Sequence, residues 1–319
     1  VYARRPNTST EATPVYRGVD LGAIRKPGVI PPGPIVQRIG RGLVFSIRAM
    51  VLAPVRSLRV FWQIISEPDC HGFQWVKPWL TIVPFLGIWR PDVLHCHFGT
   101  NGLLGARLVA TGAISAPLVV TFHGHDVHAV PRRRGSDVYT SLFATASAIT
   151  ANTSFTASGV QALGCPNEKI RIIPMGFFAE MYRAREKGFL SSSEGLSVLI
   201  VARLVEKKGT KYAIEAVAIL KDQGFSVHLR IAGDGELRAE LEGLIESLKV
   251  SDEVELLGWQ SSECVVELMR SADVVLLPSV TSTNGHMHGQ ALVLQEAQAV
   301  GTPVVSTRHN GIPEGVVDG

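Results

Sequence analysis

Paired cysteines, long apolar runs and a large net charge are all missing from this sequence. Its 319 residues include four cysteines, and no two of them form a C-x-x-C pair. Disulfide frameworks and structural zinc sites usually show such pairs. We therefore expect free thiols in a reducing cytosol. The four positions are Cys70, Cys96, Cys165 and Cys264.

Segments that direct a protein into or across a membrane are also missing. No uninterrupted apolar run reaches the roughly 18 residues of a membrane-spanning helix, and no signal peptide is visible. The chain begins without methionine, in residues that read as a strand, Val1-Tyr2-Ala3, and ends soon after its most informative motif. We expect a fragment that lacks its first strand and loop and its last helices.

The modest net charge of +3 conceals an asymmetry along the chain. Residues 1–66 carry ten basic and two acidic side chains, a net +8, whereas the remaining 21 basic and 26 acidic side chains leave −5. Within the basic part, residues 35–65 mix apolar residues with spaced arginines and are interrupted at Pro54, which predicts two helices. Basic amphipathic helices are typical of contact with anionic membranes, although solvated arginines on ordinary surface helices give the same pattern.

Apolar strand-like runs alternate with helix-like segments over the rest of the chain. This alternation predicts an α/β protein with parallel sheets and helices on both faces. A polar, Ser/Gly-rich stretch at 186–197 is the expected linker between two Rossmann-like domains, at 1–185 and 198–319, which face a cleft. The expected strands are 93–98, 117–122, 148–151, 171–174, 198–204, 227–232 and 254–258. The expected helices are 103–111, one opened by Ser154 as its N-cap, 212–222, one ending at 248, and 262–271.

The most informative stretch runs from Thr283 to Glu314. It reads as the loop, helix and strand that follow a buried strand, and its helix start exposes unpaired backbone N–H groups that suit a phosphate. Glu296, about one and a half turns into that helix, is placed to receive sugar hydroxyls. The expected elements are strand 274–277, glycine loop 284–289, helix 291–300 ended by Gly301, and strand 302–307.

This stretch resembles the nucleotide-binding segment of retaining family-4 glycosyltransferases, which have the GT-B fold. The resemblance covers about residues 90–319 and is closest to bacterial exopolysaccharide and colanic-acid-type transferases. The family pattern has a Glu, a Gly-rich loop and a second Glu, followed by Gly-Thr-Pro-Val-Val and Gly-Ile-Pro-Glu. The second Glu corresponds to Glu296, whereas His288 stands where the family has the first, which is a departure.

The resemblance implies how a nucleotide-sugar donor is bound. Val-Ala-Arg-Leu-Val-Glu-Lys-Lys-Gly resembles a family stretch whose Arg and Lys grip the donor diphosphate, here Arg203 and Lys208. Fixed cations stabilise the charge that builds on the leaving diphosphate, so no metal or other cofactor is expected. Lys207 is a weaker candidate for the same role. The expected donor-binding residues are Arg203, Lys208, His288, Gly289, Gln290, Ala291, Leu292 and Glu296.

The expected reaction centre lies in Thr-Phe-His-Gly-His-Asp, directly after a predicted strand. The family carries a His-Gly there, and its His lies near the transferred sugar, which makes His123 the expected catalytic residue. His125 and Asp126 share the loop and are expected to orient it or to touch the acceptor. Further on, Arg132 to Arg134 are read as a loop that contacts a phosphate-bearing acceptor or is simply solvated.

Other classes of function remain open at this stage. Five histidines within 34 positions, four of them in two His-x-His patterns, allow a metal-dependent hydrolase, although no H-E-x-x-H helix is present. A nucleotide-sugar 2-epimerase and a non-catalytic binding homologue are further alternatives. A dinucleotide-dependent dehydrogenase is disfavoured because no full G-x-G-x-x-G opens a helix. The five histidines are His95, His97, His123, His125 and His128.

The sequence thus predicts a transferase that moves a sugar from a UDP- or GDP-linked donor to a glycan or lipid-linked acceptor in polysaccharide biosynthesis, with retention as the resemblance implies. The expected location is the cytoplasm, peripherally on the inner face of the membrane through residues 35–65. Nucleic-acid binding is not expected, because the basic charge is not sustained and no aromatic residues are interleaved with it. The base, the sugar, the acceptor and the oligomeric state are left open.

Overall fold

The structure is a computed structural model, and it describes residues 35–66, 75–86, 90–177, 179–182, 184, 195–287 and 289–316, except the side chains of 35–39 and 41. His288, the strand expected at residues 1–3 and most of the expected linker lie outside the described residues. The boundary between the two expected domains therefore stays a prediction.

Two helices separated at Pro54 open the described chain, as the sequence predicts. α1 (Ile35–Leu52) ends just before α2 (Pro54–Ile65), where Pro54 occupies the first turn and needs no intrahelical N–H bond. The hydroxyl of Ser57 donates to the carbonyl of Ala49 at 3.0 Å and ties the two helices together. α3 (Val76–Ile82) packs against α1, since the Trp79 indole donates to the Ser46 hydroxyl at 2.9 Å.

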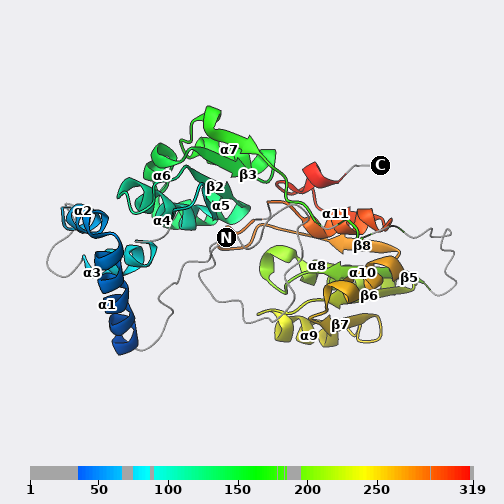
Figure 1. The fold of residues 1–319 in the computed structure, drawn as a ribbon. Helices are drawn as coiled ribbons and strands as arrows, with labels where there is room; N and C mark the ends of the chain where they lie inside the picture. Colours follow the sequence, from blue (N-terminus) through cyan, green and yellow to red (C-terminus); the bar gives the residue numbers. More distant parts are fainter. Residues whose placement is uncertain are drawn as a thin grey trace. The chain divides into compact units, whose positions relative to one another are not determined.

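The first sheet contains four described strands in the order β1-β2-β3-β4, with β1 and β2 parallel. Its strands follow the chain in simple succession, as expected for repeated strand–helix units (Figure 1). The strands are β1 (Leu94–His97), β2 (Leu118–Phe122), β3 (Ala148–Ala151) and β4 (Ile170–Ile172). The helices that follow them are α4 (Gly99–Ala110), α5 (Gly124–Arg134), α6 (Thr140–Thr145) and α7 (Ser154–Ala162).

Several sequence-based assignments in this part are wrong in detail. The segment after β2 is a helix, α5, and Arg132 to Arg134 form its last turn instead of a loop. Pro131 lies inside α5 and misled the reading because proline usually ends a helix. Cationic side chains in a last turn are favoured by the helix dipole. The N-cap of α7 is Thr153, whose hydroxyl accepts from the Thr156 N–H, and Ser154 is the first helical residue.

The second sheet has five described strands in the order β7-β6-β5-β8-β9, all paired in parallel. The predicted bounds of β6, β7, β8 and α10 are confirmed. The strands are β5 (Leu196–Val201), β6 (Val227–Ala232), β7 (Val254–Gly258), β8 (Val274–Leu277) and β9 (Val304–Ser306). The helices are α8 (Thr210–Asp222), α9 (Arg238–Ser247), α10 (Ser262–Ser271) and α11 (Leu292–Ala299).

Both faces of the second sheet are covered by helices, which explains its nearly continuous apolar strands. Successive residues of β5 point to opposite faces: Ile200 packs in a core with α8 and α9, whereas Leu199 packs in a core with α10. α11 contributes Leu294 to the first core and Ala297 to the second. The glycine predicted to end α11, Gly301, has φ +82°, a conformation that side chains disfavour.

By internal contacts the chain separates into two compact units, each described here by itself. The first comprises residues up to 122 together with 138–150 and 164–170, and the second comprises 123–137, 151–163 and residues from 171 onward. α5 and α7 therefore belong to the unit that contains the second sheet. Among the described residues, no helix is long and apolar enough to cross a bilayer.

Candidate functional site

The strand order of the second sheet defines a place where a ligand can bind. Chain progression runs from β5 outward to β6 and β7 on one side, and to β8 and β9 on the other. The order therefore reverses between β5 and β8, which are hydrogen-bonded neighbours. In open α/β sheets, ligands bind beyond the carboxyl ends of the strands at such a switch point. The loops after β5 and β8 hold the predicted cationic and glycine-bearing motifs.

Backbone contacts fix the loop after β5. The Leu204 N–H donates to the carbonyl of Asp234, after β6, at 3.0 Å, which anchors the residue next to Arg203. A short 3₁₀ turn, Glu206–Lys208, then leads to Gly209 in a left-handed conformation with φ 67° and ψ 19°. A Cβ at Gly209 would overlap the carbonyl oxygen of Pro278. Glycine is thus required where the loops after β5 and β8 cross.

The loop after β8 is hydrogen-bonded to this turn along its length. The Val280 N–H donates to the Lys207 carbonyl at 3.1 Å. The N–H and the hydroxyl of Thr283 both donate to the Glu206 carboxylate, each at 2.9 Å. The Lys207 ammonium lies 3.5 Å from the carbonyl oxygen of Met287, so it reaches the glycine loop itself. Lys207 is the weaker candidate for the diphosphate by sequence, but this contact places its ammonium beside the glycine loop.

Three cations gather here with no described carboxylate in ion-pair contact with them. Arg203 is exposed, whereas Lys207 and Lys208 are half-buried. Burial, followed by repulsion from Lys207 and Arg203, lowers the pKa of Lys208 from 10.5 to about 7. Burial and Arg203 lower the pKa of Lys207 as well. Clustered, partly desolvated cations repel each other until an anion binds, so the site is suited to a polyanionic ligand.

Two imidazoles lie beside these cations. The rings of His125, on α5, and His286, in the glycine loop, meet edge to face with centroids 4.5 Å apart. Burial lowers the pKa of His125 and of His286, and Lys207 and Arg133 add to the effect in both. Both rings therefore favour the neutral form. His125 is among the residues predicted from the sequence, whereas His286 is not, although it lies inside the predicted glycine loop.

The start of α11 lies where the motif predicts, and Gln290 has an additional contact. α11 begins at Leu292 with Ala291 as its N-cap and no side-chain cap, so its first N–H groups have no side-chain partner. The Gln290 side-chain amide accepts from the Met175 N–H at 2.7 Å and donates to the Met175 carbonyl at 3.0 Å. It also donates to Gln295 at 2.9 Å. Gln290 thus fastens the segment after β4 to the start of α11.

Glu296 lies in the second turn of α11 and is half-buried. Burial raises the pKa of its carboxyl group, and a hydrogen bond from the Tyr182 side chain acts in the opposite direction. Tyr182 comes from the segment between β4 and β5 and was not singled out in the sequence. A tyrosine far from any motif gives no local signal, because only the packed structure brings it to Glu296.

His123 and Asp126 form the start of α5. His123 is the N-cap, and its N–H donates to the Asp126 carboxylate at 2.9 Å in a capping box. Asp126 is fully buried. Asp126 therefore fixes the backbone of His123 at the start of α5. His123 itself is half-buried at the carboxyl end of β2.

The histidines of the metal-site alternative do not come together as a ligand set. His95 contacts the Thr121 hydroxyl at 2.8 Å and its ring lies 4.7 Å from that of His97. His128 instead stacks near Phe155, with ring centroids 5.2 Å apart. In the part of the chain that the structure describes, no three His, Cys, Asp or Glu side chains are grouped to hold a metal ion.

The last residue of the motif, Glu314, contacts the first amides of α7. Its carboxylate accepts from the N–H groups of Ser154 at 2.6 Å and Phe155 at 2.9 Å. A carboxylate at a helix N-terminus satisfies unpaired donors and interacts favourably with the helix dipole. The last residue of Gly-Ile-Pro-Glu therefore caps the N-terminus of α7.

Comparison with known proteins assigns both halves of the chain to related models. Residues 36–176 match the glycosyl transferase 4-like domain, and residues 183–319 match glycosyl transferases group 1. The relative named "Putative colanic acid biosynthesis glycosyltransferase WcaL" from Escherichia coli is 39% identical over 232 residues, which cover 70% of this chain and 55% of the relative. The amylovoran biosynthesis glycosyltransferase AmsK of Erwinia amylovora is 37% identical over 226 residues, covering 70% of this chain and 54% of the relative.

Solved structures resemble the fold at lower identity. HepE of Anabaena, in complex with UDP and glucose, matches with a TM-score of 0.59 and 23% identity, covering 72% of this chain and 62% of that one. The chain spans just over half the length of these two curated relatives.

Proposed function

Since the chain belongs to the GT-B glycosyltransferases that combine a 4-like domain with a group 1 domain, we propose that it transfers a sugar from a nucleoside-diphosphate donor to a glycan or lipid-linked acceptor. Its relatives named for colanic acid and amylovoran biosynthesis favour a role in exopolysaccharide assembly. Retention of the anomeric configuration is part of the proposal, as the family resemblance implies.

The observation that carries this proposal is the meeting of two loops at the switch point of the second sheet. Arg203, Lys207 and Lys208 lie on one loop, and Lys207 reaches the carbonyl of Met287 on the other. A nucleoside diphosphate gains negative charge as the bond to its sugar breaks. Positioned cations in a partly desolvated site stabilise that charge, and removing one such donor typically costs about 3 kcal/mol in the transition state.

The other predicted site residues contact the remaining parts of the donor in this proposal. The backbone of Gly289, Gln290, Ala291 and Leu292 lines the diphosphate and sugar, since these residues lead into the first turn of α11. Glu296 receives the ribose hydroxyls. His288 hydrogen-bonds the donor sugar or a phosphate where the family has a carboxylate, and His123 lies at the reaction centre. UDP is the first nucleotide to test because HepE was solved with UDP, and GDP is the second.

A calorimetric titration with UDP, GDP and NAD, each with and without EDTA, tests the donor assignment. We expect saturable binding of UDP or GDP that EDTA leaves unchanged, and no binding of NAD. Destabilisation by EDTA without nucleotide binding would contradict the proposal and favour a metal enzyme. Incubation with labelled nucleotide sugar then separates transfer from epimerisation, since a 2-epimerase would yield an altered sugar without an acceptor.

Two substitutions assign the binding and chemical roles separately. Glu296→Ala is expected to weaken nucleotide binding, whereas His123→Ala is expected to lower turnover more than binding. Glu215→Ala, which removes an exposed carboxylate from α8, is the matched control and should behave as wild type. Unchanged nucleotide affinity in Glu296→Ala would rule out the ribose contact.

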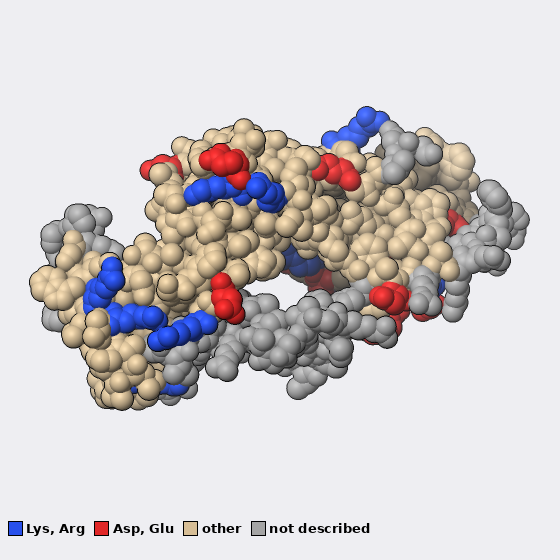
Figure 2. Space-filling view, turned by 45° about the horizontal axis from the view of Figure 1, so that its top comes forward, with Lys and Arg blue, Asp and Glu red and all other residues tan. Residues whose placement is uncertain are grey.

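We further propose that α1 and α2 rest on an anionic membrane surface on the cytoplasmic side, where a lipid-linked acceptor is found. Neither helix contains an acidic residue. Arg48, Arg56 and Arg59 accompany large apolar side chains that face solvent, with Val55 79% and Val51 73% exposed. Figure 2 shows basic side chains among mostly uncharged ones on the part of the surface that carries these helices.

Sedimentation with vesicles of phosphatidylglycerol and phosphatidylethanolamine tests this surface. We expect binding that falls with salt and with the triple change Val51→Ser, Val55→Ser and Trp62→Ser. A control that replaces two exposed apolar residues in and just after α8, Ile219→Ser and Phe225→Ser, should bind like wild type. Equal loss in both variants would show non-specific adhesion and contradict the proposal.

A further inference from the structure

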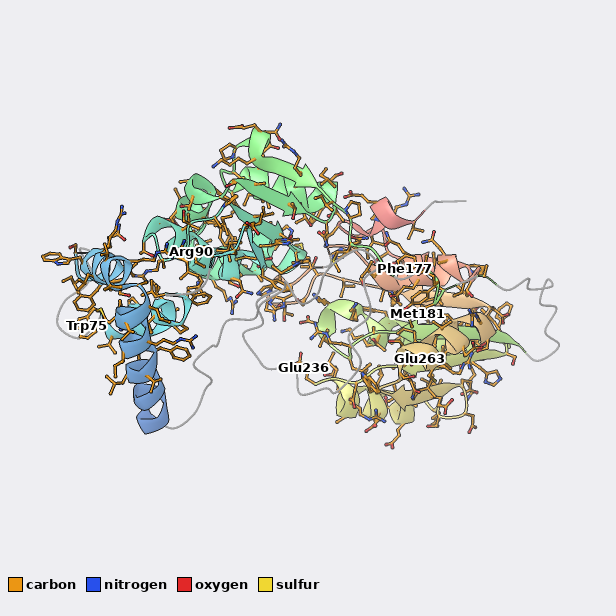
Figure 3. All side chains as sticks on the ribbon, viewed as in Figure 1. Trp75, Arg90, Phe177, Met181, Glu236 and Glu263 are labelled. Carbon is orange, nitrogen blue, oxygen red and sulfur yellow. The ribbon has the colours of Figure 1, made fainter. Side chains whose placement is uncertain are left out.

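Tyr182 is a buried tyrosine outside the motifs that define the proposed donor site. It lies between β4 and β5, in a short turned segment, and is only 8% exposed. Its side chain packs in the core that contains Ala297 and Val300 of α11 and its C-terminal boundary. The ring of Phe177 meets the Tyr182 ring edge to face, with centroids 5.3 Å apart. Figure 3 shows Phe177 and Met181 on this part of the molecule, near α11.

Packing therefore holds the Tyr182 ring against the helix that carries Glu296. The ring cannot leave without opening the core around α10 and α11, because the surrounding side chains are themselves buried. The hydroxyl, at the tip of this fixed ring, makes a hydrogen bond with the Glu296 carboxylate. The Tyr182 hydroxyl therefore has a fixed position beside Glu296, whereas an exposed side chain would change its conformation freely.

The direction of this hydrogen bond is set by the chemistry of the two groups. Burial, and then the neighbouring Glu296 charge, raise the pKa of Tyr182 to about 12, so its phenol keeps its proton and donates. Burial raises the pKa of Glu296 and so favours its protonated form, which is a poorer acceptor than the carboxylate. Donation from Tyr182 favours the ionised carboxylate. The hydrogen bond therefore restrains the Glu296 side chain and favours its charged form.

We propose that Tyr182 is a positioning residue of the donor site, which holds the Glu296 carboxylate oriented to receive the ribose hydroxyls of the nucleotide. This inference rests on the proposed function, because it takes Glu296 as the ribose ligand. It adds a residue that touches neither the nucleotide nor the reacting atoms and acts only through Glu296.

Tyr182→Phe removes the hydroxyl and keeps the packed ring. The dissociation constant of UDP or GDP, whichever the wild type binds, is expected to rise about three- to tenfold at pH 7.5. The Glu296 pKa rises when its donor is lost, so the ratio of variant to wild-type dissociation constants should grow as the pH falls from 8 to 5.5. A residue that only filled the core would give a ratio independent of pH. Tyr212→Phe, at an exposed tyrosine of α8, is the matched control.

A double-mutant cycle tests whether the effect passes through Glu296. In a Glu296→Gln background, Tyr182→Phe should change nucleotide affinity little, because no carboxylate remains to be held ionised. The same loss in both backgrounds would overturn the inference. Nucleotide analogues give an independent test, because a ratio of affinities does not depend on the fraction of a variant that is folded. Wild type should bind UDP more tightly than 2′-deoxy-UDP and 3′-deoxy-UDP, or GDP more tightly than its deoxy forms. Tyr182→Phe should reduce that difference in affinity.

The outcomes separate this inference from the function on which it depends. Absence of any nucleotide binding by the wild type would contradict the proposed function itself. Nucleotide binding that is lost in Glu296→Ala but unchanged in Tyr182→Phe at every pH would leave the function intact and overturn the role of Tyr182.

Discussion

The carboxyl edges of the two sheets carry different kinds of chemical groups. At the second sheet, Arg203, Lys207 and Lys208 form a partly buried cluster of cations. At the first sheet, β1 and β2 end in imidazoles, His97 and His123, and Phe98 follows β1 with 43% of its surface exposed. The second edge therefore carries fixed positive charge, whereas the first carries imidazoles, which can accept and donate a proton.

The two edges also differ in how their backbones are held. Glycine supplies the unusual conformation at the second edge, where Gly209 has φ 67°. At the first edge a bulky residue does so, because Phe98 has φ 72° and ψ 135°. Such conformations cost about 1–3 kcal/mol in residues other than glycine and are concentrated at functional sites. We infer that backbone strain at Phe98 raises the free energy of the first edge. At the second edge, electrostatic repulsion among the three cations does so.

The largest effect is expected from removing one cation at the second edge. Lys208→Met should weaken binding of UDP or GDP by about ten- to a hundredfold, as expected for a charge-assisted hydrogen bond worth about 1.5–3 kcal/mol. Calorimetry measures the change. Lys211→Ala, an exposed lysine at the start of α8, should have no effect, and an equal loss in both would show that general charge, and not the cluster, attracts the nucleotide.

The pH dependence of binding should also distinguish the edges. Free Lys208, with a pKa of about 7, loses its proton as pH rises through 7, and an anion binds the protonated form. Nucleotide affinity should therefore fall, by at most about tenfold per pH unit, between pH 7 and 9. Titrations in buffers of different ionisation enthalpy should detect proton uptake on binding at pH 8. Lys208→Met should abolish both effects, and their persistence would assign them to another group.

A smaller effect is expected at α7. Glu314→Ala leaves the Ser154 and Phe155 amides without their carboxylate, which should lower the free energy of unfolding by about 1 kcal/mol. Chemical denaturation measures it. Glu246→Ala, which removes an exposed carboxylate from α9, is the control. An equal loss in the two variants would show that the contact with α7 contributes nothing specific.

The smallest effect concerns the strained residue at the first edge. Phe98→Gly should be about 1 kcal/mol more stable than Phe98→Ala, because only glycine adopts this conformation without strain. The same pair of substitutions at Leu58, within α2 and exposed, should have the opposite order, since glycine weakens a helix. Thermal denaturation of the four variants gives the comparison. The same order at both positions would remove the argument for strain.

Local pattern was sufficient for the second sheet and insufficient for parts of the first. β6, β7, β8 and α10 have their predicted bounds because buried parallel strands and an amphipathic helix leave strong signals. α5 was missed because Pro131 and three arginines read as a loop, while its capping pair, His123 and Asp126, is an uncommon one. Asp126, in the first turn of α5, is a buried carboxylate that accepts a hydrogen bond from the backbone N–H of His123.

The predicted site depends on residue type and on the family resemblance. Arg203, Lys208 and Glu296 were named because the resemblance gives the first two a diphosphate and the third a ribose, and these roles stay predictions. Tyr182 and His286 could not be named, because only packing and the path of a loop bring them near these residues. The side chain of Gln290 is a related case, since the sequence suggested its backbone as a ligand and gave no sign of the clamp on Met175.

The contact between Glu314 and α7 has a consequence for the timing of folding during synthesis. The two partners are separated by 160 residues, so the ribosome makes the first turn of α7 long before it makes its carboxylate. At the 5–20 residues per second typical of translation, the delay is roughly 8–32 s. Throughout that interval water must satisfy the Ser154 and Phe155 amides. The start of α7 should therefore remain open to hydrogen exchange on nascent chains that stop before residue 314, and become protected once that residue has emerged.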